Sequence, residues 1–170
     1  MGEATSAPAW ALVEQLACRD LVLRLRAVAQ LRTLGAAAAP ALERGLAGHS
    51  RVEVRRWCAH LLQQAHRLAS ACAIVAATND PVAAVRVLAL QTLAGGPGRV
   101  DDLGLDPIPH LVRLAHHDRS KRVRLAALAH LGQRLHDPRA RAAVATADAR
   151  ASGPWLLDEM VERRPVAAHY

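Results

Sequence analysis

The chain has 170 residues, of which 52% are hydrophobic and 2% aromatic, with no Phe and a formal net charge of +7. This length suits one domain that buries roughly two thirds of its unfolded surface. No apolar run reaches the roughly 18 residues that span a bilayer, and no charged stretch precedes an apolar one at the start. We therefore expect neither a membrane segment nor a secretory signal. The few aromatic residues also argue against a base-stacking platform.

The positive charge is carried almost entirely by arginine, because Lys121 is the only lysine. The codon usage of a GC-rich bacterial genome would produce this bias without selection for phosphate binding, and the charge is spread along the chain. Nucleic-acid binding stays open without being favoured. Cys18, Cys58 and Cys72 have no metal-ligand spacing and predict buried thiols in a reducing cytoplasm.

Taken in chain order, the sequence predicts a disordered lead over 1–7 and then one helix after another. Asp20 is expected to cap one helix that Gly35 ends, and Ser50 and Asp80 are candidate caps further on. The expected helices span about 8–17, 21–34, 36–47, 51–66, 67–78, 81–94, 106–117, 119–135 and, more weakly, 138–150.

The domain organisation follows from these elements. Residues 8–150 are expected to form one helical array, which a glycine-rich insertion loop over 95–104 interrupts. Residues 151–170 are expected to form a capping helix around Trp155 and a polar tail.

A branched apolar residue followed by arginine recurs four times, with Arg26, Arg55, Arg86 and Arg124 at intervals of 29, 31 and 38 residues. A small residue follows each arginine by three positions, and a leucine follows three of the four by seven. An aspartate, or once His49, stands six residues before each arginine. A period of this length predicts stacked helix pairs, which usually serve as a binding surface.

These motifs resemble HEAT repeats of the short bacterial, phycobilisome-lyase-type subclass. The resemblance covers about residues 10–140 and is strongest in Asp80-Pro81 with Val85-Arg86 and in Asp118 with residues 123–132. Repeat two departs from the pattern at His49, which leaves its Asp–Arg contact in question. Repeat one has two registers, with Arg24 or Arg26 as its signature arginine. The resemblance implies an all-α, right-handed α-solenoid of about four to five helix pairs, and it says little about function.

In such arrays the signature arginine reaches an aspartate at the helix start of an adjacent repeat. We therefore expect a structural ladder along the stack. We favour the ladder over the alternative, in which these arginines bind an anionic ligand. The predicted ladder residues are Arg55, Asp80, Arg86, Asp118 and Arg124.

The inner-helix face opposite the core is expected to line a concave groove, basic in its N-terminal half and apolar in its C-terminal half. An amphipathic partner helix, a second copy of the chain or the 95–104 loop would cover the apolar half. The alternative, that a wide apolar face serves tight stacking, stays open. The predicted partner-binding residues are Arg24, Arg56, His60, Val87, Leu90, Arg122, Leu125 and Leu128, with Arg99 on the insertion as an outlier.

Motifs for catalysis are absent from the sequence, which has no phosphate loop, nucleophile elbow or His-Glu-x-x-His. His116 and His117 point about 100° apart on a helix and do not readily share a metal ion. We expect no metal and no cofactor. The enzyme alternative is a resemblance to HEAT-like alkylpurine DNA glycosylases through Trp57, beside Arg56 and His60. However, Trp57 falls at a position that the other repeats use for the core.

The sequence thus predicts a non-catalytic cytoplasmic adaptor or scaffold that holds a protein partner, or a second copy of itself, in the concave groove. DNA binding, and less so glycosylase activity, is the alternative. No small-molecule substrate and no membrane partner are inferred.

Overall fold

The computed structural model is all-α over the residues it describes, which are 6–63, 68–94 and 104–150. The chain divides into two compact units, residues 1–107 and 108–170, and each is described by itself. Within the described ranges, no helix has the length and apolar character needed to cross a membrane.

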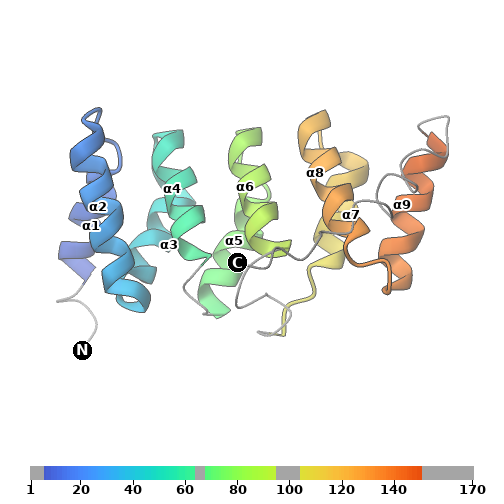
Figure 1. The fold of residues 1–170 in the computed structure, drawn as a ribbon, viewed down its shortest axis with the longest axis horizontal. Helices are drawn as coiled ribbons and strands as arrows, with labels where there is room; N and C mark the ends of the chain where they lie inside the picture. The colour runs from blue at the N-terminus through green and yellow to red at the C-terminus, as the bar shows by residue number, and fades with distance from the viewer. Residues whose placement is uncertain (1–5, 64–67, 95–103, 151–170) are drawn as a thin grey trace, which may run out of the picture. The chain divides into compact units, whose positions relative to one another are not determined.

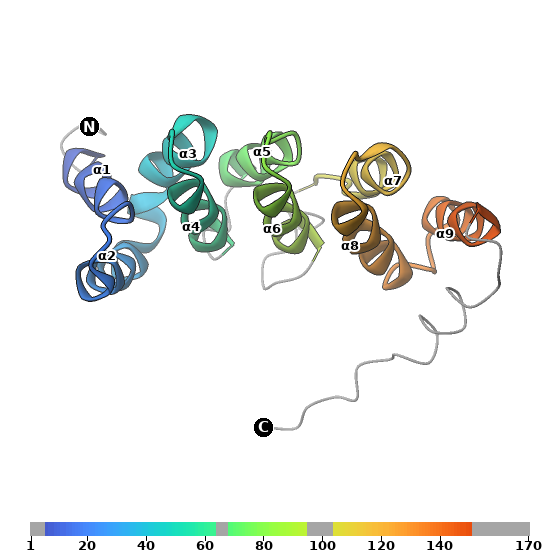
Figure 2. The ribbon, with the colours of Figure 1, turned by 90° about the horizontal axis from the view of Figure 1, so that it is seen from above.

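The first unit is built from consecutive helix pairs (Figure 1). They are α1 (Ser6–Gln15) with α2 (Leu21–Leu34), α3 (Ala39–Gly48) with α4 (Val52–Leu62), and α5 (Leu68–Ala77) with α6 (Ala83–Ala94). The short 3-10 helix η1 (Gly35–Ala38) joins the first pair to the second. Helices α1, α3 and α5 form one layer, and α2, α4 and α6 form the other (Figure 2).

The core of this unit is made of small and medium aliphatic side chains, as the composition requires. Val13, Leu31, Val54 and Leu93 are almost completely buried in it. Gly45 marks a close approach of α3 to α4 and α1. A Cβ at this position would lie 2.7 Å from the Sγ atom of Cys58 on α4 and 2.9 Å from a methyl group of Val13 on α1.

The second unit contains α7 (Ile108–His117), α8 (Lys121–Gly132) and α9 (Pro138–Arg150), which pack on one another. Leu111, Leu114, Val123 and Leu131 are fully buried there.

Local signals at the ends of α2 are confirmed. The Asp20 carboxylate accepts hydrogen bonds from the backbone N–H groups of Val22 at 2.8 Å and Leu23 at 3.3 Å. Gly35 ends the helix with a φ of 52°, a conformation that glycine adopts at little cost. The prediction that Ser50 caps α4 is wrong. His49 Nδ1 accepts from the Arg51 backbone N–H at 3.1 Å instead.

Burial along α2 decides the register of the first repeat. In repeats two to four, the residues at +3, +4 and +7 from the repeat arginine are buried. Counted from Arg24, these positions are Ala27, Val28 and Leu31, all buried. Counted from Arg26, they are exposed, so the Leu25-Arg26 register used above is wrong and Arg24 is the repeat arginine.

Three predicted segments lie wholly or largely outside the described residues: the lead over 1–7, most of the insertion loop with Arg99, and the cap and tail over 151–170.

Candidate partner-binding surface

The turns that precede α2, α4, α6 and α8 share one hydrogen-bond pattern. The carboxylates of Asp20, Asp80 and Asp118 each accept from the backbone N–H two residues further on, at 2.7–2.8 Å. His49 takes the same place with its Nδ1 atom. An imidazole nitrogen therefore replaces a carboxylate oxygen at this turn.

The repeat arginines donate hydrogen bonds to the backbone of three of these turns. The Nη1 atoms of Arg55, Arg86 and Arg124 each donate at 2.8 Å to a backbone carbonyl six residues earlier, at His49, Asp80 and Asp118 respectively. This contact is local to each helix start.

Arg55 also makes a contact between successive helix pairs. Its Nε donates to Asp80 Oδ2 at 2.7 Å, and its Nη2 donates to Asp80 Oδ1 at 3.2 Å. The two side chains are only 11% and 6% exposed, so this is a shielded, two-point ion pair. It joins α4 to the turn that begins α6.

Arg24 is the counterpart of Arg55 one repeat earlier, and the residue in the position of Asp80 is His49. Arg24 Nε is buried and has no hydrogen-bond partner in the structure. The His49 ring lies instead 3.5 Å from a carboxylate oxygen of Glu14 and against Trp10, with ring centroids 6.4 Å apart. The substitution at residue 49 therefore leaves the Arg24 guanidinium without a carboxylate.

Arg24 lines a pocket of about 440 Å³ together with residues of α4 and one of α6. The lining residues are Arg24, Glu53, Arg56, Trp57, His60 and Leu88. The Trp57 and His60 rings meet edge to face at 6.0 Å, and His60 Nε2 lies 3.4 Å from Arg32 Nη2. Three of the predicted partner-binding residues, Arg24, Arg56 and His60, are thus brought together here.

An exposed apolar strip on α2 extends this site. Val22 and Leu25 are 58% and 49% exposed. Each stands 31 residues before a pocket residue, Glu53 and Arg56 respectively, and so occupies the same face of its repeat. We call this region the α2–α4 surface. It comprises Val22, Arg24 and Leu25 on α2 and Glu53, Arg56, Trp57 and His60 on α4.

Most of the apolar residues predicted for the groove are buried instead. Leu90 is completely buried, and Val87 and Leu128 are each only 7% exposed. Leu90 and Leu128 stand four residues after their arginines, a position that belongs to the core side of every described repeat. Leu125 on α8 is 45% exposed, and Arg122 beside it is exposed as well. The strongly exposed leucine and valine side chains therefore gather on α2, in what was predicted to be the basic half.

The prediction that the cysteines are buried holds for Cys58 alone, because Cys18 is half-buried and Cys72 is exposed. Burial raises the pKa of the Cys58 thiol to about 12. Among the described residues, no group of three or more His, Cys, Asp and Glu side chains is placed to hold a metal ion.

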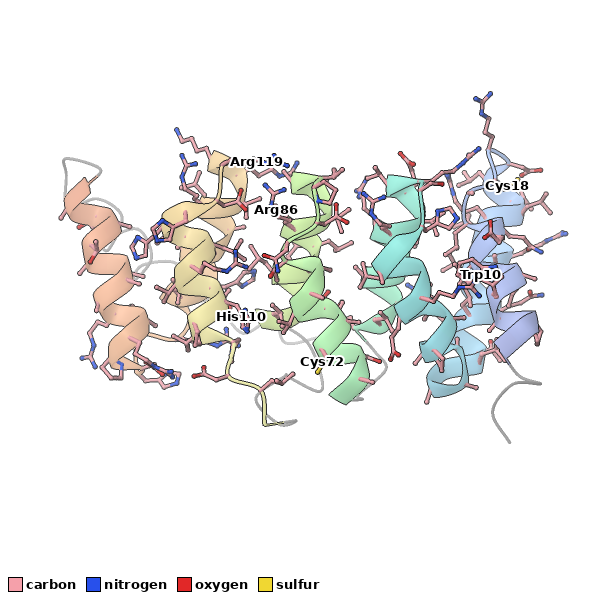
Figure 3. All side chains as sticks on the ribbon, turned by 180° about the vertical axis from the view of Figure 1, so that it is seen from behind. Trp10, Cys18, Cys72, Arg86, His110 and Arg119 are labelled. Atoms are coloured by element: carbon pink, nitrogen blue, oxygen red, sulfur yellow. The ribbon has the colours of Figure 1, made fainter. Side chains whose placement is uncertain are left out.

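A second hollow, of about 680 Å³, lies near the α1/α2 end of the first unit. Trp10 and Cys18, which both line it, are seen there in Figure 3. The guanidinium carbon of Arg44, which also lines the hollow, lies 4.1 Å from the centre of the Trp10 ring, so the two side chains form a cation–π contact there. A comparison of the sequence with protein-family models and with characterised proteins found no match.

Proposed function

We propose that the chain is a non-catalytic adaptor of the HEAT-repeat class, a short right-handed α-solenoid that holds a protein partner against the α2–α4 surface. One observation carries the proposal. Exposed apolar side chains, Val22 and Leu25, share a face with Arg24 and Arg56, neither of which pairs with a carboxylate among the described residues. Protein interfaces combine an apolar centre with arginine and tryptophan in this way.

The composition of the surface favours a protein over DNA. Val22 and Leu25 would gain nothing from phosphate contacts, whereas an apolar partner surface would remove them from water. Because all three cysteines are free, a reducing cytoplasm is the compartment we propose.

The test is site-specific photo-crosslinking in the bacterial cytoplasm, with a photoreactive residue in place of Leu25. We expect an adduct with a protein at this position. The matched control carries the same photoreactive residue in place of Ala76, an exposed position on α5 in the other layer, and should give no adduct. In parallel, a labelled 20-base-pair duplex should show no binding at physiological salt.

The two experiments together have a contrary outcome. Salt-sensitive duplex binding without any protein adduct at residue 25 would replace the adaptor function with nucleic-acid binding. An adduct of twice the mass of the chain would make the partner a second copy.

A further inference from the structure

The charged residues within the α2 helix are all arginines. Its sequence contains Arg24, Arg26 and Arg32 and no acidic residue. Arg26 forms no ion pair with any described residue, and Arg32 has only His60 as a side-chain neighbour at hydrogen-bond distance. The helix itself therefore contributes only positive side chains along its 14 residues, a length of about 21 Å, and the Asp20 carboxylate lies at its N-terminal end.

The guanidinium of Arg24 needs an acceptor that the chain does not supply. In the next repeat the Asp80 carboxylate satisfies Arg55 at 2.7 and 3.2 Å. In this repeat His49 holds the equivalent position, and the buried Arg24 Nε has no partner. The Nε atom itself is closed to solvent, but Arg24 is only partly buried and lines the pocket, so a carboxylate from outside the chain can pair with its positive charge there.

Resting on the proposed adaptor function, we propose that the partner presents an acidic amphipathic helix to the α2–α4 surface. Its apolar face covers Val22 and Leu25, and its carboxylates pair with Arg24 and Arg56. Charge complementarity selects this occupant. A second copy docked through α2 would bring arginines against arginines, and a flat anionic bilayer is poorly shaped to reach a half-buried arginine in a pocket.

The experiment starts from an unbiased selection. A displayed library of random 16-residue peptides is selected on the immobilised full chain, and its enriched members are measured in solution by fluorescence anisotropy. We expect the enriched peptides to carry apolar residues at helical spacing together with several Asp or Glu residues.

Substitutions then locate the binding site. Leu25→Asp should weaken the binding of the enriched peptide at least tenfold. Leu23→Asp is its matched control, because Leu23 is 44% exposed on the same helix but stands two residues before Leu25 and so lies on the opposite side of the helix, and this variant should bind like the parent. Arg24→Gln should weaken binding about tenfold. A double variant, Arg24→Glu with Arg56→Glu, should prefer a peptide in which every Glu and Asp is replaced by Lys.

The outcomes separate the partner's chemistry from the function itself. Enriched peptides that are neutral or basic but still lost on Leu25→Asp would overturn the acidic helix and leave the adaptor surface standing. Selection of no peptide at all would also overturn the acidic helix. Peptides unaffected by Leu25→Asp would overturn both proposals. So would binding to phosphatidylglycerol vesicles that Leu25→Asp abolishes, since the occupant would then be a lipid surface.

Discussion

Two neighbouring junctions between helix pairs in the first unit are held together by different contacts. Between the α3–α4 pair and the α5–α6 pair, the shielded ion pair of Arg55 with Asp80 joins one repeat to the next. Between the α1–α2 pair and the α3–α4 pair, Arg24 has no such carboxylate.

The first junction is held instead by packing and by an aromatic side chain. Gly45 lets α3 approach α1 so closely that a methyl group would have no room. Trp10 on α1 is stacked by Arg44 on α3 and lies against His49, which pairs with Glu14. The repeat arginine of these two junctions therefore joins successive helix pairs only where a carboxylate is present. Where the carboxylate is missing, the arginine is available for another role.

The largest expected effect tests the second junction. Asp80→Ala removes a carboxylate and leaves the Arg55 guanidinium buried and unpaired, which should lower the free energy of unfolding by about 3–5 kcal/mol. Urea denaturation followed by circular dichroism measures this. The matched control is Asp20→Ala, since Asp20 caps a helix but makes no ion pair with the described residues, and its loss should cost about 1 kcal/mol. Equal losses in the two variants would show that the ion pair adds nothing to the cap.

The next effect tests the close packing at the first junction. Gly45→Ala places a methyl group against Cys58 and Val13, and the strain should exceed the gain in helix propensity, for a net loss of about 1–3 kcal/mol. Gly48→Ala, in the last position of the same helix, meets no atom within 4 Å and should stabilise by about 0.5–1 kcal/mol. If Gly45→Ala stabilises as well, the two helices are not in tight contact.

A smaller effect is expected when the first junction is given the carboxylate that the second junction has. His49→Asp supplies the missing carboxylate, whereas His49→Asn supplies the same turn hydrogen bond without the charge. We expect the Asp variant to be more stable than the Asn variant by about 1 kcal/mol, because only Asp pairs with Arg24. Both are made with Glu14→Gln, which removes the carboxylate 3.5 Å from the His49 ring. The difference should vanish on adding Arg24→Gln. A difference that persists would mean that the carboxylate acts on another group.

The all-α fold class and most helix ends could be predicted because the sequence signals for them are local. The Asp20 cap and the Gly35 turn bracket α2 within a few residues of sequence, and the structure has α2 over that span. The register of the first repeat could not be predicted from such local signals. Leu23-Arg24 and Leu25-Arg26 carry the same dipeptide, and only the burial of Ala27 and Leu31 distinguishes them.

The candidate site could be predicted only in its polar part, for a related reason. Arg56 and His60 stand at offsets that face outward in a repeat whose register was certain. Leu25 was missed because the wrong register placed it on the core side. Leu90 was misplaced because an offset of four residues lies at the edge between the groove and the core, and helical spacing alone does not tell how deeply a neighbour covers that edge.

The last expected effect is chemical and reports on the contact between α3 and α4 at Gly45. The Cys58 thiol touches the helix surface at Gly45, and burial raises its pKa to about 12. At pH 8 it should remain protonated and unreactive towards Ellman's reagent, whereas Cys72 should react at once and Cys18 more slowly. In the unfolded chain the thiol loses its proton near pH 9, so the folded state should lose stability as the pH rises above that value. Gly45→Ala, by forcing α3 and α4 apart, should make Cys58 reactive, and Gly48→Ala should not. Three thiols that react at one rate in the parent chain would mean that the packing of α4 on α3 around Gly45 opens readily.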